Sequence, residues 1–157
     1  MSSDPQELID VQLINIPLAI LAASREHHEG LMREFRLMAL AGSVPDGAAP
    51  RRLLELVQLL GVQYADTSAT PELAIDAALA RGERTLDVTY TVPAGVAEAA
   101  SALAQLMNEA DEFCRSEQLL TLARPAVQVE FADWYLRCFV EQMAGAPPQP
   151  WTGPLVP

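Results

Sequence analysis

The sequence predicts an α+β fold that is rich in helix and carries a small three-stranded sheet. Three β-like runs each reach a proline and then turn into a helical pattern: residues 9–17, 86–93 and 119–125. Proline fixes φ and lacks an N–H donor, so it suits the first turn of a helix and not the interior of a strand. The segments after these prolines carry apolar residues at helical spacing, which supports the same assignment. An all-α bundle is the alternative fold class.

The first strand is expected over residues 9–16. Its apolar side chains fall on both faces: Ile9, Val11 and Leu13 on one face, and Ile14 and Ile16 on the other. Burial on both faces is typical of a central or covered strand. Pro17 is then expected to open a helix that continues to about Ala41, where Gly42 ends it.

Two further helices are expected before the second strand. One runs from about Arg51 to Gln63 and is apolar nearly all the way round. The other starts at Thr70, whose side chain can cap the first turn ahead of Pro71, and ends at Gly82. We interpret both helices as an insertion between the first and second strand units.

The second strand is the clearest element of the sequence. Leu86, Val88, Tyr90 and Val92 alternate with polar residues, as in a strand with one buried face. An amphipathic helix is expected to follow over about residues 94–115.

A third strand is expected over residues 118–122, and the helix that follows Pro125 is expected to end at Gly145. If all three strands share one sheet, residues 86–122 form a βαβ crossover, which should be right-handed.

A single domain accounts for most of the chain. Residues 1–145 are predicted to form one globular domain, because a chain of this length can bury one core. Residues 146–157 hold too many prolines for helix or sheet and should form an extended tail. We expect Trp151 to pin this tail onto the domain.

Composition excludes several classes of function. All ten basic residues are arginine, and the formal net charge is −11. The absence of lysine excludes a P-loop lysine and Schiff-base chemistry. The acidic balance argues against partners such as duplex nucleic acid and anionic membrane surfaces. No apolar stretch approaches the ~18 residues that a membrane span needs. Cys114 and Cys138 are expected to be reduced core residues, so we expect a cytoplasmic protein.

No motif for catalysis, a metal or a cofactor stands out. His28-Glu29 begins like a zinc-protease signature, but Met32 stands where the second histidine ligand is needed. No glycine-rich loop follows a strand, and no serine has the context of a nucleophile elbow. We therefore expect no catalytic, cofactor-binding or metal-binding residue, and a protein that is not an enzyme.

Two helices are the predicted interaction surfaces. The last helix is apolar on most sides, as is the helix from Arg51, and such helices are buried in a core or at an interface. The candidate contact residues for a protein partner, or for a homodimer, are Arg51, Arg52, Trp134, Tyr135 and Phe139. The alternative is a small-molecule sensor, with its ligand in a pocket between the helices and the sheet.

The chain also resembles a known family. The run Asn-Glu-Ala-Asp-Glu-Phe-Cys-Arg-Ser-Glu-Gln-Leu-Leu-Thr-Leu-Ala at 108–123, with Trp134-Tyr-Leu and Pro-Pro-Gln-Pro-Trp151, resembles an uncharacterised family of bacterial regulatory proteins. That family is associated with anti-sigma and anti-anti-sigma partner switching. The resemblance implies a non-enzymatic regulator with a sigma-regulatory protein partner. Members are sometimes labelled ATP-binding, but Asn108 is followed by no Asp-x-Gly-x-Gly, so no ATP site is expected.

Overall fold

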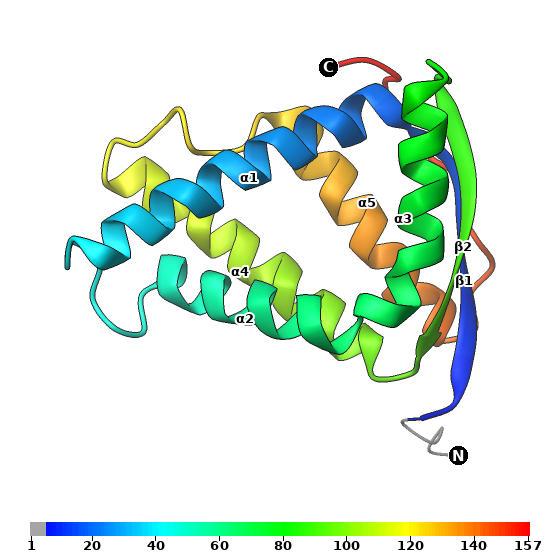
Figure 1. Ribbon diagram of the computed structural model, residues 1–157, viewed down its shortest axis with the longest axis horizontal. Coiled ribbons are helices and arrows are strands. Elements are labelled where there is room, and N and C mark those ends of the chain that lie inside the picture. The colour runs from blue at the N-terminus through cyan, green and yellow to red at the C-terminus, as the bar shows by residue number, and fades with distance from the viewer. Residues whose placement is uncertain (1–5) are drawn as a thin grey trace.

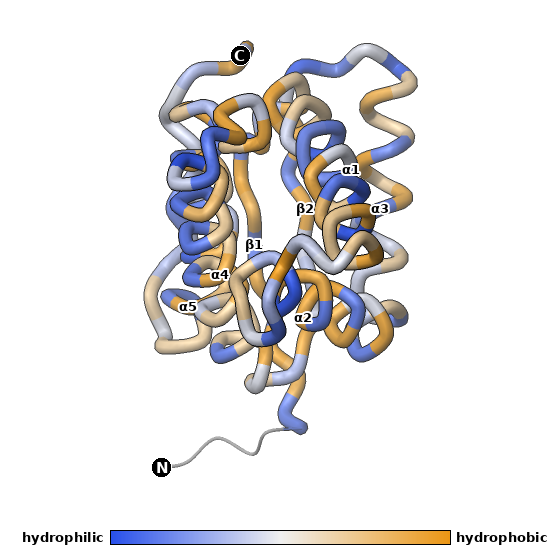
Figure 2. The backbone as a smooth tube through the Cα atoms, turned by 90° about the vertical axis from the view of Figure 1, so that its left-hand side faces the viewer, coloured by the Kyte–Doolittle hydropathy of each residue, from blue (hydrophilic) through white to orange (hydrophobic). Residues whose placement is uncertain are grey.

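The fold is α+β and rich in helix, as predicted, but its sheet has two strands. The computed structural model describes residues 6–157 (Figure 1). Over these residues the elements are β1 (Leu8–Pro17), α1 (Leu18–Leu40), α2 (Ala49–Gln63), α3 (Ala65–Ala80), β2 (Thr85–Pro93), α4 (Val96–Ser116) and α5 (Ala126–Met143). β1 and β2 pair antiparallel. Figures 1 and 2 show α1 and α3 on one side of the molecule, α4 and α5 on the other, and the sheet across one end.

The prediction of a third strand over residues 118–122 is wrong. These residues form turns, because the buried carboxylate of Asp111 in α4 binds the segment that follows. Asp111 Oδ1 accepts the Arg124 backbone N–H at 3.1 Å, and its Oδ2 lies 2.8 Å from Arg124 Nη2. The tether brings the chain back onto α4, so the βαβ crossover predicted over residues 86–122 does not form.

The sequence predicts that both faces of the first strand are covered. In the structure, a bulge in β1 changes which of its side chains are buried. Leu13 pairs with Val88 and Ile16 pairs with Leu86, so two residues of β1 face one residue of β2. The bulged Asn15 has φ 63° and donates its backbone N–H to Asp87 Oδ1 at 2.7 Å. The extra residue changes the phase of the alternation, so Ile16 joins Leu13 in the same buried cluster. On the other face of the strand, Asp10 and Gln12 are exposed and Ile14 is half-buried.

α3 begins earlier than the sequence indicates. Its first residue is Ala65, so Thr70 is not the N-cap and Pro71 lies inside the helix. The turn before Pro71 is held by the carbonyl of Tyr64, which accepts the backbone N–H of Ser68 at 3.1 Å and the hydroxyls of Thr67 and Ser68. Hydroxyl side chains can supply such local bonds, which a pattern based on Thr-Pro alone does not reveal.

The buried apolar residues form two clusters. One lies between the sheet and α1, α3 and α5, and the other lies between α1, α2 and α4. The prediction that Trp151 pins the tail is confirmed, because its side chain is 3% exposed and belongs to the first cluster. Its backbone N–H donates to the Ile14 carbonyl at 3.0 Å, and its carbonyl accepts from Asn15 Nδ2 at 2.8 Å. Among residues 6–157, no helix is long and apolar enough to span a membrane.

Candidate ligand-binding groove

Two of the residues predicted to contact a partner lie in the core. Trp134 and Phe139 are each 6% exposed. The Trp134 ring packs against Trp151 with 5.5 Å between centroids, and its Nε1–H donates to the Gln149 carbonyl at 2.9 Å. In the chain as described, both residues pack internally, and Trp134 holds the tail.

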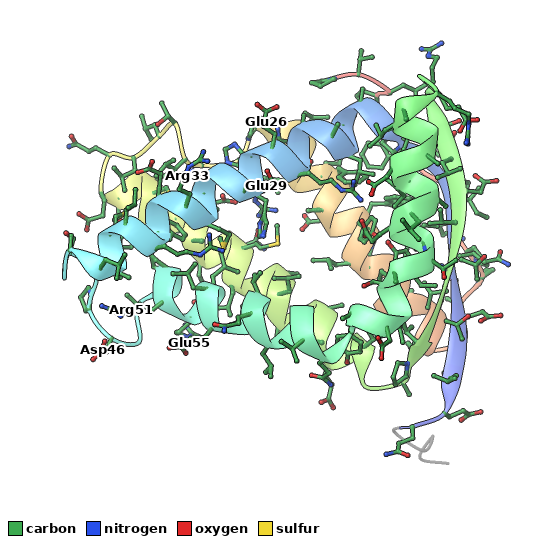
Figure 3. The ribbon with its side chains drawn as sticks, viewed as in Figure 1. Glu26, Glu29, Arg33, Asp46, Arg51 and Glu55 are labelled. Carbon is green, nitrogen blue, oxygen red and sulfur yellow. The ribbon has the colours of Figure 1, made fainter. Side chains whose placement is uncertain are left out.

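The two arginines make intramolecular contacts. Arg51 donates to the carbonyls of Val44 (3.0 Å) and Ala39 (3.2 Å) and lies beside Asp46, so it closes the loop between α1 and α2 (Figure 3). Arg52 donates to Glu109 Oε2 at 2.7 Å and joins α2 to α4. The five predicted residues therefore do not form one exposed surface.

Tyr135 lies at the centre of a different feature, an apolar groove made of two neighbouring cavities. The first has a volume of about 350 Å³ and lies between α2, α3, β2, α4 and α5. The second has a volume of about 250 Å³ and lies between α1, α4 and α5. Both are lined by Leu103, Tyr135 and Leu136, so these residues form a shared wall. Ligand cavities in proteins typically begin at ~300 Å³, and the two together exceed that size.

Polar side chains meet at one wall of this groove. Arg25 in α1 forms an ion pair with Glu72 in α3 and donates to Asp76 Oδ1 at 2.9 Å. Glu72 Oε1 accepts the hydroxyl of Tyr90 at 3.3 Å, and Tyr90 is hydrogen-bonded to Tyr135. A chain of contacts thus runs from α1 through α3 and β2 to α5.

Burial keeps both tyrosines in this chain neutral. It raises the pKa of Tyr90 to about 12, and it raises the pKa of Tyr135 well above the usual value for a phenol. At neutral pH both side chains are therefore phenols and not phenolates.

A small cavity whose lining includes several polar side chains adjoins the second part of the groove. It has a volume of about 30 Å³, which is room for one water molecule. Ser24 Oγ and Gln128 Oε1 both line it, are buried and have no hydrogen-bond partner in the protein. His28 lines it as well, and burial lowers the pKa of its imidazole. His27 is bound separately through Nε2 to the Leu122 carbonyl, at 2.9 Å.

Within residues 6–157, no three His, Cys, Asp or Glu side chains are grouped so that they could hold a metal ion.

Sequence reasoning missed Arg25, Glu72 and Tyr90 as members of a site. One signal was available: the alternation of β2 places Tyr90 on the buried face, and a buried tyrosine hydroxyl needs a hydrogen-bond partner. The identity of that partner depends on how α3 packs on β2, which no local pattern contains.

Comparison of the chain with protein-family models, with curated proteins and with solved structures found no match.

Proposed function

We propose that the protein binds a small apolar molecule in the groove between its helices and sheet. The observation that carries the proposal is the pair of cavities joined at Leu103, Tyr135 and Leu136. The function is that of a sensor or carrier, and no catalytic step is part of it.

The chemistry of the lining supports this proposal. Apolar side chains from α2, α4 and α5 form most of the walls, and the Arg25–Glu72–Tyr90–Tyr135 contacts supply a few convergent polar groups. Small-molecule sites commonly combine an apolar lining with a few polar groups that fix orientation.

A fluorescent probe can test the proposal. N-phenyl-1-naphthylamine is a neutral aromatic amine whose emission rises in apolar surroundings, and we expect it to bind with one-to-one stoichiometry. Leu103→Trp places a larger side chain in the shared wall and should weaken binding at least tenfold. The matched control is Leu59→Trp, because Leu59 lies on α2 and is 59% exposed. Equal binding by wild type and both variants, with all three folded by circular dichroism, would refute the proposed site.

A second proposal keeps the protein-contact function that the sequence predicts, including a sigma-regulatory partner or a homodimer. Leu59 and Val62 favour it, because these α2 side chains are 59% and 78% exposed. Exposed apolar side chains gathered on one element are typical of interaction sites. Val62→Asp should abolish concentration-dependent self-association in sedimentation equilibrium if α2 forms a homodimer. A wild-type chain that stays monomeric at high concentration would exclude the dimer.

A further inference from the structure

Two buried polar atoms beside the groove lack a hydrogen-bond partner. They are Ser24 Oγ in α1 and Gln128 Oε1 in α5, and neither finds a partner among residues 6–157. Gln128 as a whole is only 7% exposed, so contact with bulk water does not compensate its amide. Buried polar groups in folded proteins are nearly always bonded to the protein or to an ordered water. The two atoms therefore call for an occupant that the protein itself does not supply.

The two residues line the same small cavity, where α1 meets α5. Its volume of about 30 Å³ is the space of a single water molecule. Two unpartnered polar atoms on two different helices thus occur together with room for one small molecule.

The charges around the cavity favour an uncharged occupant. The guanidinium of Arg124 lines it, but this group is already paired with Asp111 at 2.8 Å. Burial lowers the pKa of His28, so its imidazole is neutral at neutral pH. None of the described residues that line the cavity carries a carboxylate. A cation would therefore lose its hydration without gaining a counter-charge.

The two atoms also define the hydrogen bonds that the occupant must make. Gln128 Oε1 is an amide oxygen and can only accept, so the occupant must donate to it. The Ser24 hydroxyl can either donate or accept. A water molecule donates and accepts, and buried waters typically make about three hydrogen bonds. Water therefore matches the size, the charge and the hydrogen-bonding of the cavity.

We propose that one structural water occupies this cavity and bridges Ser24 Oγ to Gln128 Oε1, joining α1 to α5. The site goes beyond the ligand-binding function proposed above and does not depend on it. Ser24, His28, Met107 and Ala132 line both this cavity and the second cavity of the groove. The water is therefore part of the groove wall.

A double-mutant cycle tests the bridge. Ser24→Ala and Gln128→Met each remove one partner of the water with little change in side-chain size. Urea unfolding of the full chain gives the folding equilibrium constant of each variant. We expect each single substitution to lower this constant about tenfold, because one buried hydrogen bond is lost and the other polar group is left unsatisfied. The double variant should also lose about tenfold, and not about a hundredfold, because both substitutions remove the same bridge.

Ser101→Ala is the matched control for the serine substitution. Ser101 lies within α4 and is exposed, so its replacement reports only the higher helix propensity of alanine. This variant should be as stable as the wild type or slightly more stable.

A dry cavity would give the opposite result. Removal of an orphaned polar atom from an empty space relieves a cost, so each single variant would then equal or exceed the wild type in stability. That result would overturn the proposal. Losses that add in the double variant would overturn the bridge as well, because they would show that the two atoms are satisfied separately.

A high-resolution crystal structure of the full chain gives a direct second measurement. We expect the density of one water within hydrogen-bonding distance of both Ser24 Oγ and Gln128 Oε1. An empty cavity, or a direct bond between the two side chains, would overturn the proposal. Neither measurement uses the fluorescent probe, so failure of the water site and failure of the ligand-binding groove are distinguishable.

Discussion

The side-chain amide of Gln142 in α5 binds the backbone of Gln12 in β1 in the way a neighbouring strand would. Gln142 Oε1 accepts the Gln12 N–H and Gln142 Nε2 donates to the Gln12 carbonyl, both at 2.8 Å. Two residues further along β1, the Trp151 N–H donates to the Ile14 carbonyl. The edge of β1 that does not face β2 is thus covered by a side chain and by the tail. Unpaired strand edges invite pairing with other chains, so this cover favours a stable two-stranded sheet.

Gln142→Ala should expose this edge of β1. We expect a loss of about 1–2 kcal/mol in the free energy of unfolding, because two backbone groups lose their partner, and increased self-association. Urea unfolding and analytical ultracentrifugation measure the two effects. Glu141→Ala is the matched control, since it removes only a partly exposed ion pair with Arg137 in the same helix. Equal stability of the two variants would show that the Gln142 amide does not hold the edge.

Asn15 should tolerate glycine better than alanine. Its φ of 63° lies in the left-handed region, which glycine adopts freely and alanine does not. Both variants lose the Nδ2–H bond to the Trp151 carbonyl. The difference between their free energies of unfolding therefore reports the backbone conformation at this residue. We expect Asn15→Ala to be about 1 kcal/mol less stable than Asn15→Gly. The reverse order in thermal unfolding would argue against the bulge.

Substitution of either partner of the buried Asp111–Arg124 ion pair should lower the stability of the fold strongly. The two side chains are 5% and 7% exposed, so Asp111→Ala leaves a buried guanidinium without its carboxylate. We expect a cost of about 3–5 kcal/mol in the free energy of unfolding. Glu112→Ala, at the next position of α4, removes only an exposed pair with Arg115 and should cost less than about 0.5 kcal/mol. A small cost for Asp111→Ala would contradict the role of this pair in returning the chain to α4.

Stability should fall at alkaline pH as the buried tyrosines ionise. The pKa of Tyr90 is raised from 10.0 to about 12 in the folded chain, so its contribution is fully present below pH 10 and is lost as the pH rises through 12. The pKa of Tyr135 is raised in the same direction. The tyrosinate absorbance near 295 nm should therefore rise together with the loss of the circular dichroism signal. Titration of all three tyrosines near pH 10 with the fold intact would contradict the burial of Tyr90 and Tyr135.

Local patterns predicted much of the helical structure and little of the groove. The alternation in β2 and the proline at the start of α1 are properties of adjacent residues, so they were visible in the sequence. The short apolar run at residues 118–122 resembles a strand locally, but the tether between Asp111 and Arg124 decides its conformation. The phase of β1 likewise depends on Asn15, which can adopt a left-handed conformation that no alternation of apolar residues reports.

The candidate site could be predicted only in part. The sequence predicts Tyr135 as a contact residue for a protein partner, and in the structure Tyr135 lines the groove. Its contact with a ligand is a proposal. Arg25, Glu72 and Tyr90 come from three different elements and meet only through the packing of α1 and α3 around β2. The volume of the groove depends on how the helices pack, and neither the composition nor the residue spacing of the sequence predicts it.

Methyl-resolved NMR with decan-1-ol tests the central claim most directly. The claim is that an apolar molecule occupies the groove between the helices and the sheet. We predict saturable shifts of the methyl resonances of Leu103 and Leu136, with none at the exposed Leu59 and Val62 on α2. Shifts confined to Leu59 and Val62, or no saturable shifts at all, would contradict the claim.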